Sequence, residues 1–253
     1  MTALPAITCL CPTYGRFQRL QDAVACFLLQ DYAGPKRLLI LNDAPIPIIL
    51  SSALLALRSP RGEAGSTPST KSTISVVNAR PRFATLGHKR QALLEMAETL
   101  LVAHWDDDDV YLPWHLSACA ARLTAAPSAS CAKPLTAYLA YGPPDGWTLQ
   151  GVRRNAFEGQ MVFRRERALA LGGYPPLDSG QAAALLSAFR AAGEVHEWEP
   201  PAHEISYVYR WADGLGHVSR SSCRSHEAFA ARNGDFGLDA TGRPQPLTTS
   251  RAR

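Results

Sequence analysis

The sequence predicts an α/β fold, in which a mostly parallel sheet carries helices on both faces, and three observations predict it. Short apolar segments of strand length alternate with longer segments of helical periodicity through the first half of the chain. Two of these apolar segments end in polar or acidic residues, which is usual where strands finish at the carboxyl edge of such a sheet. Hydrophobic residues make up 46% of the 253 residues, enough for a packed core.

The first half of the chain supplies the alternation. Residues 7–11 form an apolar run that Pro12 should end, because proline cannot donate to a sheet ladder. Residues 85–101 carry a long helical pattern that leads directly into the next strand. The expected strands are 7–11, 37–41, 74–77 and 102–105, and the expected helices are 16–30, 46–57 and 85–101.

The second half is less regular. Pro113 suits the first turn of a helix, and Gly172-Gly173 should stop another. The expected helices are 112–125, 166–171 and 180–192, and the expected strands lie within 130–148, at 160–164 and at 205–209. We expect one domain over residues 1–225, with halves of about 1–115 and 116–225, followed by a polar, flexible tail over 226–253.

Composition excludes several classes of protein. No apolar stretch approaches the roughly 20 residues that a membrane helix needs, so no membrane span is expected. The six cysteines form no CxxC pair, which is typical of free thiols in a reducing compartment. The formal charge of +4 permits an anionic partner without requiring one. We therefore expect a cytoplasmic protein.

Four consecutive aspartates follow Trp105 at the predicted end of a strand. Crowded carboxylates repel one another, so such a run indicates a role beyond stability. Asp106 and Asp108 should point to the same face of an extended segment, because strand side chains alternate. Their hard oxygen ligands favour Mg or Mn over Zn. The run therefore predicts a divalent cation site; the alternative is an acidic turn or a helix N-cap, which aspartate also suits.

Short motifs follow one another along the chain in a definite order: Cys11-Pro12-Thr13-Tyr14-Gly15-Arg16, Leu41-Asn42-Asp43, Gly87-His88-Lys89-Arg90, Asp106-Asp107-Asp108, Phe163-Arg164-Arg165, Leu171-Gly172-Gly173-Tyr174, and Tyr209-Arg210-Trp211 through His217-Val218-Ser219. Together they resemble the GT-A-fold glycosyltransferases of the inverting family 2, over about residues 5–220. The resemblance implies a Rossmann-like donor half, a smaller mixed sheet on the acceptor side, and transfer of a sugar from a nucleotide sugar.

The resemblance also implies a metal-dependent UDP-sugar site. Asp43 would accept a hydrogen bond from the uracil ring, and Asp106 and Asp108 would hold a Mg or Mn ion that His217 completes. Asp109 is left to cap the following helix. Each of these residues also has an ordinary explanation, as a turn aspartate, a surface histidine or a solvated charge. The residues expected to bind the nucleotide are Pro12, Thr13, Tyr14, Arg16, Asp43, Lys89, Arg90, Asp106 and Asp107.

The catalytic base is where the sequence departs from the resemblance. An inverting transferase needs a carboxylate to deprotonate the acceptor hydroxyl. Ala182 stands where the family places that aspartate, and alanine cannot accept a proton. Three explanations compete: the chain is an engineered base-deficient variant, Asp178 serves as the base from a shifted loop, or the protein binds the donor without efficient turnover. Glu158 is a further carboxylate on the acceptor side, which could orient the donor sugar or the acceptor.

The acceptor is less defined. Arginines concentrate in the acceptor half: Arg153, Arg154, Arg164, Arg165, Arg167, Arg210, Arg220, Arg224 and Arg232. They would suit DNA with a hydroxymethylated pyrimidine, whereas a saccharide or small-molecule acceptor stays open. Two other classes compete. A sugar-nucleotide nucleotidyltransferase would normally show a glycine-rich loop after its first strand, and a non-catalytic nucleic-acid-binding protein would leave the aspartate run unexplained.

Overall fold

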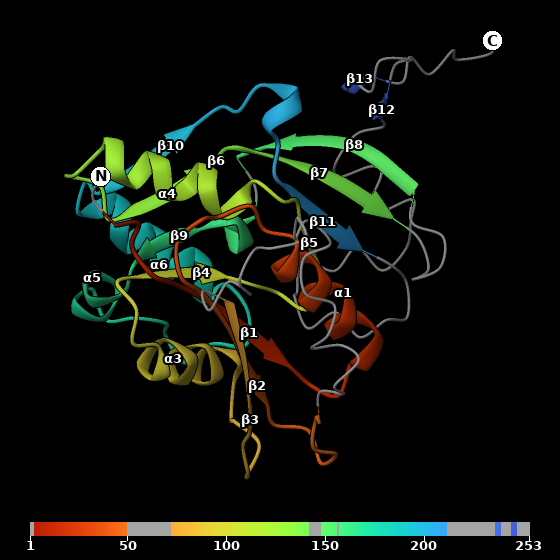
Figure 1. The fold of residues 1–253 in the computed structure, drawn as a ribbon, viewed down its shortest axis with the longest axis vertical. Helices are drawn as coiled ribbons and strands as arrows, with labels where there is room; N and C mark the ends of the chain where they lie inside the picture. The colour runs from red at the N-terminus through yellow and green to blue at the C-terminus, as the bar shows by residue number, and fades with distance from the viewer. Residues whose placement is uncertain are drawn as a thin grey trace, which may run out of the picture.

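A computed structural model describes residues 3–49, 72–141, 148–155, 157–211, 236–238 and 244–246. A seven-stranded sheet lies at its centre, in the order β10-β6-β9-β4-β1-β2-β3 (Figure 1). Neighbouring strands are parallel except β9, which is antiparallel to β4 and β6. The strands are β1 (Ile7–Thr13), β2 (Lys36–Asn42), β3 (Ser72–Asn78), β4 (Leu101–His104), β6 (Cys131–Pro134), β9 (Val162–Arg164) and β10 (Val195–Trp198).

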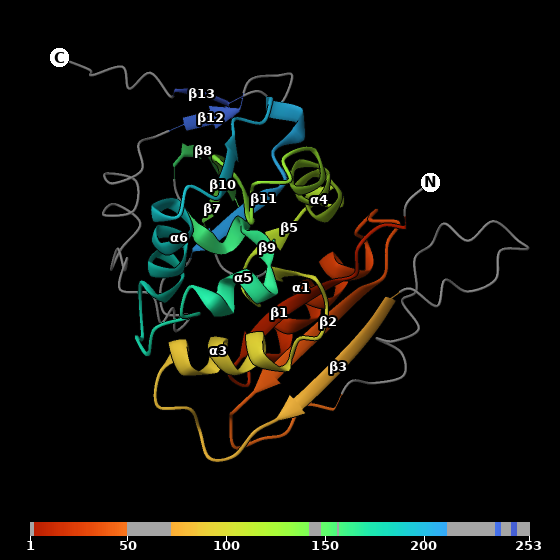
Figure 2. The same ribbon diagram turned by 90° about the vertical axis from the view of Figure 1, so that its left-hand side faces the viewer.

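Helices cover both faces of this sheet, which confirms the predicted fold class. In β1, Cys9 and Cys11 pack toward the helices α1 (Phe17–Leu28) and α4 (His115–Ala125). Leu10 points the other way, into the core formed with α3 (Leu86–Met96), α5 (Arg165–Ala170) and α6 (Gln181–Ala191). Figure 2 shows these three helices together on one side of the sheet. Side chains that alternate along the strand thus pack into two separate cores.

A smaller mixed sheet stands beside the first, as expected for the acceptor side. Its order is β5-β11-β7-β8, and β11 is antiparallel to β5 but parallel to β7. The aspartate run joins the end of β4 to the start of β5, so it lies where the two sheets meet. The strands are β5 (Val110–Tyr111), β7 (Thr136–Tyr141), β8 (Thr148–Arg154) and β11 (Tyr207–Trp211).

The first strand runs through Pro12, where the sequence predicted that it would end. β4 pairs with β1 only as far as Leu10, whose carbonyl accepts from the Trp105 N–H at 3.2 Å. Successive residues of a strand bond to opposite sides, so Pro12 faces the side that β4 has left. Its missing N–H therefore costs no ladder bond, and pairing with β2 continues to Thr13.

Other expected boundaries were also wrong; the helix expected over 112–125 starts at His115, and the strand expected over 205–209 runs from Tyr207 to Trp211. The helix expected over 85–101 ends at Met96, because Ala97 is already extended. Residues 46–49 of the helix expected over 46–57 are not helical, and the rest lies outside the described residues. The strand expected over 160–164 starts at Val162 and follows the 3-10 turn η1 (Glu158–Gln160). Most of the tail lies outside the described residues, although β12 (Phe236–Leu238) and β13 (Pro244–Pro246) pair as a small antiparallel sheet.

The start of α3 is fixed from two directions. The Thr85 hydroxyl accepts from the His88 N–H at 3.2 Å, which caps the helix. The Gly87 N–H donates to the Leu177 carbonyl at 2.9 Å. A Cβ on Gly87 would lie 1.9 Å from the Pro175 carbonyl oxygen, so only glycine permits this contact. The donor-side helix is thereby attached to the segment that leads into α6.

Two expectations from composition can be compared with the structure. The five cysteines that the structure describes are free, and four of them are buried. Every helix in the described part of the chain is too short or too polar to cross a bilayer.

Candidate active site

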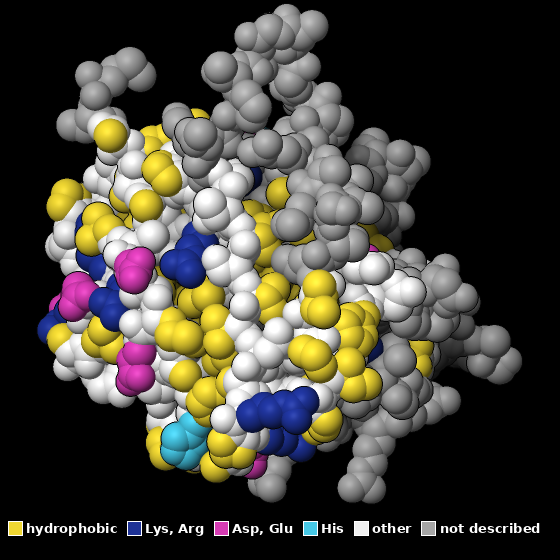
Figure 3. Space-filling view, turned by 60° about the horizontal axis from the view of Figure 1, so that its bottom comes forward, with side chains coloured by type: hydrophobic (Ala, Val, Ile, Leu, Met, Phe, Trp, Pro, Cys, Tyr) yellow, Lys and Arg dark blue, Asp and Glu magenta, His cyan; other side chains and the backbone are white. Residues whose placement is uncertain are grey.

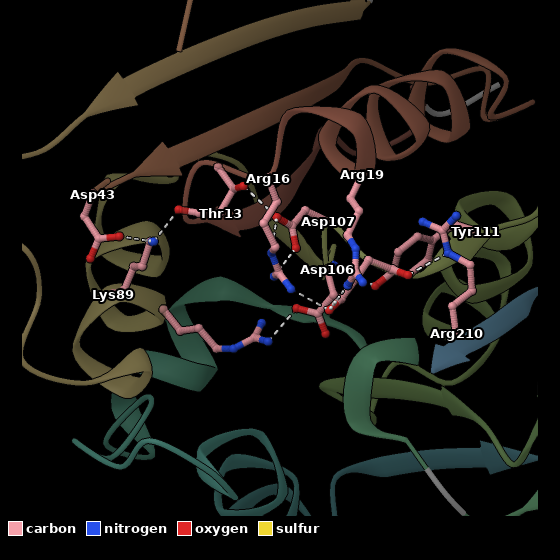
Figure 4. A network of polar contacts seen from close by, with 11 residues as sticks. Thr13, Arg16, Arg19, Asp43, Lys89, Asp106, Asp107, Tyr111 and Arg210 are labelled. Atoms are coloured by element: carbon pink, nitrogen blue, oxygen red, sulfur yellow. Dashed lines mark hydrogen bonds and ion pairs between the residues drawn. The ribbon is translucent and has the colours of Figure 1, made fainter. Parts of the chain in front are cut away.

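The predicted donor residues converge at the carboxyl edge of β1, β2 and β4. Segments far apart in the chain supply them: the end of β1 with the start of α1, the end of β2, the first turn of α3, and the aspartate run after β4. Figure 4 shows their side chains joined in one polar network. The sequence placed these motifs at one edge, and the structure brings them into direct contact.

The four aspartates differ in exposure, and the run turns between β4 and β5 where an extended segment was expected. The side chains of Asp106 and Asp108 are 22% and 15% exposed, whereas that of Asp107 is 1% exposed. Asp109 is buried as well. Arg16 contacts the carboxylates of both Asp107 and Asp108, so the turn orients these side chains, and a shared face for Asp106 and Asp108 stays a prediction.

Asp107 is held inside the protein by β1 and α1. The Thr13 hydroxyl donates to its Oδ2 at 2.6 Å, and Arg16 Nε donates to the same oxygen at 3.1 Å. Arg16 Nη2 also contacts Oδ1, which completes a two-point pairing. Burial raises the pKa of Asp107 to about 6, although Arg16 opposes the rise. Burial disfavours the charge of Arg16, but Asp108 and Asp107 outweigh it and raise the pKa of that guanidinium.

The two partly exposed aspartates, Asp106 and Asp108, also meet guanidinium groups. Arg16 Nη1 donates to Asp108 Oδ2 at 2.9 Å, and Arg19 Nη1 lies 3.4 Å from the same oxygen. Arg90 Nη2 donates to Asp106 Oδ1 at 2.5 Å. The charge of the run is thus partly neutralised by arginines. Sequence reasoning missed Arg19, although it lies one helical turn after Arg16 and so on the same face of α1.

Asp109 does not cap the next helix, and that expectation was wrong. Its carboxylate accepts from the Tyr207 hydroxyl and from the Arg210 N–H at 3.0 Å, both on β11. Burial raises the pKa of Asp109 well above its usual range. Arg210 Nε donates to the Asp108 carbonyl at 2.6 Å, and its Nη1 donates to Asp22 at 2.7 Å. The second sheet is therefore attached to the aspartate run, a contact that the sequence did not reveal.

Asp43 and Lys89 form a buried pair under the end of β1. Lys89 Nζ contacts Asp43 Oδ1 and donates to the Thr13 carbonyl at 2.5 Å. Asp43 Oδ2 accepts from the Phe83 N–H at 3.0 Å, and the aspartate side chain is only 3% exposed. Burial lowers the pKa of Lys89, against the opposing effect of Asp43. The pair fixes the ends of β1 and β2; contact of Asp43 with uracil stays a prediction.

Tyr14 is the exposed member of the first motif. Its ring lies 4.2 Å from the guanidinium carbon of Arg82, a cation–π contact. Pro12 and Thr13 beside it are buried. Figure 3 brings this end of the molecule forward and shows Lys and Arg among hydrophobic side chains, with the acidic side chains toward one side.

Of the predicted acceptor-side residues, Glu158 begins η1, which packs against α6 and β4. A Cβ on Gly159 would lie 2.6 Å from the Tyr207 hydroxyl and 3.5 Å from Asp106 Oδ2, so the turn that Glu158 begins adjoins the aspartate run. Ala182 is the second residue of α6 and packs partly against the core. Asp178 is exposed, directly after Leu177. His217 lies outside the described residues.

The carboxylate oxygens of the aspartate run are ligands that suit a hard divalent cation. Asp106 and Asp108 present two partly exposed carboxylates. Magnesium sites commonly use one or two protein carboxylates and complete the shell with phosphates and water. Over the described ranges, His, Cys, Asp and Glu side chains form no cluster of three or more that could hold a metal. The two aspartates would therefore need the nucleotide, or a residue outside those ranges, to complete the site.

Comparison with known proteins adds the fold. No protein-family model matches the sequence, and no curated protein matches it. A structure of S. aureus TarS 1-349 in complex with UDP-GlcNAc matches 84% of this chain and 60% of that one, with a TM-score of 0.59 and 13% identity. The mannosyltransferase PcManGT from Pyrobaculum calidifontis, in complex with GDP-Man and Mn²⁺, matches 82% of this chain and 57% of that one, with a TM-score of 0.52 and 18% identity.

The chain has the fold of these two proteins. It spans less than two thirds of the length of either. Identities this low establish the architecture, and the chemistry has to be argued from the side chains at the edge of the sheet.

Proposed function

We propose that the protein is an inverting glycosyltransferase of the family 2 type, which moves a sugar from a UDP-sugar to an acceptor hydroxyl. One observation carries the proposal: four motif segments from distant parts of the chain meet in a single network at the carboxyl edge of the sheet. In open α/β folds this edge is the usual place for a nucleotide. The fold is shared with proteins solved with UDP-GlcNAc and GDP-Man.

We assign a separate role to each part of this network. Asp106 and Asp108 would hold a Mg or Mn ion, with His217 as a third ligand. When bound, the cation would neutralise charge on the diphosphate leaving group. The guanidinium groups of Arg16 and Arg90 contact Asp108 and Asp106. Such groups can also pair with phosphate oxygens. Arg16 is also held by the buried Asp107, which keeps its guanidinium near the aspartate run.

The catalytic base is the weak point of this machinery. Ala182, which stands at the base position by resemblance to the family, is the second residue of α6, and Asp178 is an exposed carboxylate four residues earlier. Glu158 opens the turn that adjoins Asp106. We propose that the chain as it stands transfers sugar slowly because residue 182 carries no carboxylate, and that Glu158 orients the donor sugar or the acceptor.

The acceptor class follows less directly from the structure. Of the arginines that suggested DNA, Arg154, Arg165 and Arg167 each pair with a glutamate of this chain, and Arg164 donates to backbone carbonyls. Their charge is partly balanced, which favours a saccharide or small-molecule hydroxyl over hydroxymethylated DNA. Assays of UDP release against sugars, small alcohols and hydroxymethylated duplex DNA would identify the acceptor.

The first test concerns the metal and the nucleotide. Asp108→Ala should abolish the Mn-dependent part of UDP binding in calorimetry, because it removes one of the two partly exposed carboxylates proposed to hold the cation. Glu98→Ala is the matched control, since Glu98 is an exposed carboxylate that lies 3.9 Å from Arg37 and outside the network. Unchanged metal-dependent affinity in Asp108→Ala would contradict the assignment of the site.

The same titration separates the other classes. A nucleic-acid-binding protein without transferase activity should bind UDP weakly and without regard to Mn. A nucleotidyltransferase should release pyrophosphate from UTP and a sugar phosphate, whereas a glycosyltransferase should release UDP from a UDP-sugar.

A further inference from the structure

Arg16 makes two unequal sets of contacts with the aspartate run. Toward Asp107 it contacts both carboxylate oxygens, through Nε at 3.1 Å and through Nη2. Toward Asp108 it makes one hydrogen bond, from Nη1 at 2.9 Å. Asp107 is also held by Thr13 and is buried, whereas Asp108 is partly exposed. The contact with Asp107 is therefore an anchor, and the contact with Asp108 is the one that can be exchanged.

The exchangeable contact lies on one of the two carboxylates suited to a cation. Arg19 Nη1 stands 3.4 Å from the same Asp108 oxygen, so two positive groups already face it. A divalent cation approaching Asp108 would meet like charge at short range. A diphosphate would change this balance, since it carries negative charge and offers a guanidinium a two-point partner.

We propose that Arg16 competes with the divalent cation for Asp108 and releases it to the donor's diphosphate, which makes cation binding depend on the nucleotide. This rests on the proposed function and adds to it the order in which the site fills. The protein without nucleotide keeps Asp108 paired with arginine, and nucleotide and cation then bind with positive coupling.

The test is calorimetric titration of Mn²⁺ into the full chain, with and without saturating UDP. In the wild type, UDP should tighten Mn²⁺ binding about tenfold, in the middle of the range usual for coupled sites. In Arg16→Gln, Mn²⁺ alone should bind about tenfold more tightly than to the wild type, and UDP should add little. Arg37→Gln is the matched control, because it removes the same charge from β2 near Glu98 and away from the run.

Two variants separate competition from simple loss of structure. Arg37→Gln is the first, because it lies outside the network and its Mn²⁺ affinity without UDP should stay at the wild-type value. If Arg16→Gln does not fold, Arg16→Lys replaces it, since lysine keeps the charge but cannot reproduce the two-point contact. Arg16→Lys should then bind Mn²⁺ alone more tightly than the wild type, by less than tenfold.

The outcomes distinguish this inference from the proposed function. If UDP strengthens Mn²⁺ binding in the wild type, but the Arg16 variants bind Mn²⁺ alone no better, the competition is overturned and the transferase site stands. If the wild type binds neither UDP nor Mn²⁺, the proposed function fails and the competition with it.

Discussion

The proposed donor edge, at the ends of β1, β2 and β4, and the proposed acceptor side differ in how exposed their polar pairs are. At the donor edge, Thr13 and Asp107 form a buried pair, as do Lys89 and Asp43. On the acceptor side, Arg154 is 69% exposed where it meets Glu199. Buried charges tolerate little change, because a lost partner leaves an uncompensated charge in the interior. A substitution in a buried pair of the donor edge should therefore cost more stability than one in the exposed pair.

The largest expected effect tests the acceptor side. Ala182→Asp should raise the rate of transfer about 100- to 10,000-fold, which is the usual value of general-base assistance. Affinity for UDP and Mn²⁺ should barely change, because residue 182 belongs to α6 and not to the donor network. The measurement is UDP release under single-turnover conditions.

Asp178→Ala, made in both backgrounds, is the control for this prediction. If loss of Asp178 silences the enzyme whatever stands at 182, then Asp178 is the base and the argument from Ala182 is wrong.

Breaking the buried pair tests the donor edge. Lys89→Met should lower the free energy of unfolding by about 3–5 kcal/mol, since it strands the buried Asp43 carboxylate. Denaturant unfolding measures the change. The double variant Lys89→Met, Asp43→Asn should lose less than the sum of the two single variants, because it leaves no unpaired charge. Additive losses would show that the two residues do not act as a pair.

Two buried histidines predict how stability depends on pH. Burial lowers the pKa of His115 to about 3, and burial together with Arg90 lowers that of His104 well below its usual range. The unfolded chain takes up these protons near pH 6.5, so the stability is present above that pH and lost as pH falls toward 3.

His115→Asn can keep the hydrogen bond that Nδ1 shares with the Ser206 hydroxyl at 2.9 Å. It should flatten the loss of stability by up to about 1.4 kcal/mol per pH unit. Denaturant unfolding from pH 7 to pH 4 measures the slope. An unchanged slope would mean that His115 also takes up a proton in the folded protein.

The smallest effect is expected at the exposed pair. Arg154→Ala should cost less than about 1 kcal/mol of stability, in contrast to Lys89→Met. If duplex DNA binds at low salt, Arg154→Ala should leave its affinity nearly unchanged. A marked loss of DNA affinity, with a flatter dependence on salt, would place nucleic acid back among the acceptors.

Much of the architecture could be predicted from the sequence because it depends on local pattern. Apolar segments of strand length and the helical periodicity located β1 to β4 and the helices α1, α3 and α4, with errors at their ends. The glycines at 172–173 marked the end of a helix for steric reasons. Pro113 was expected in the first turn of a helix but lies in the turn before α4, whose N-cap is Trp114. The boundary at Pro12 was missed because the effect of a proline depends on which neighbouring strand is present.

The sequence by itself determined the α/β class and the order of the motifs. These follow from the apolar pattern and the composition of each segment. Only the tertiary structure decided that Arg16, Arg19 and Arg90 pair with the run, that β11 takes Asp109, and that Lys89 pairs with Asp43. Lys89 and Asp43 are 46 residues apart, and Asp109 and Arg210 of β11 are 101 apart. No local pattern encodes which buried donor a carboxylate will meet.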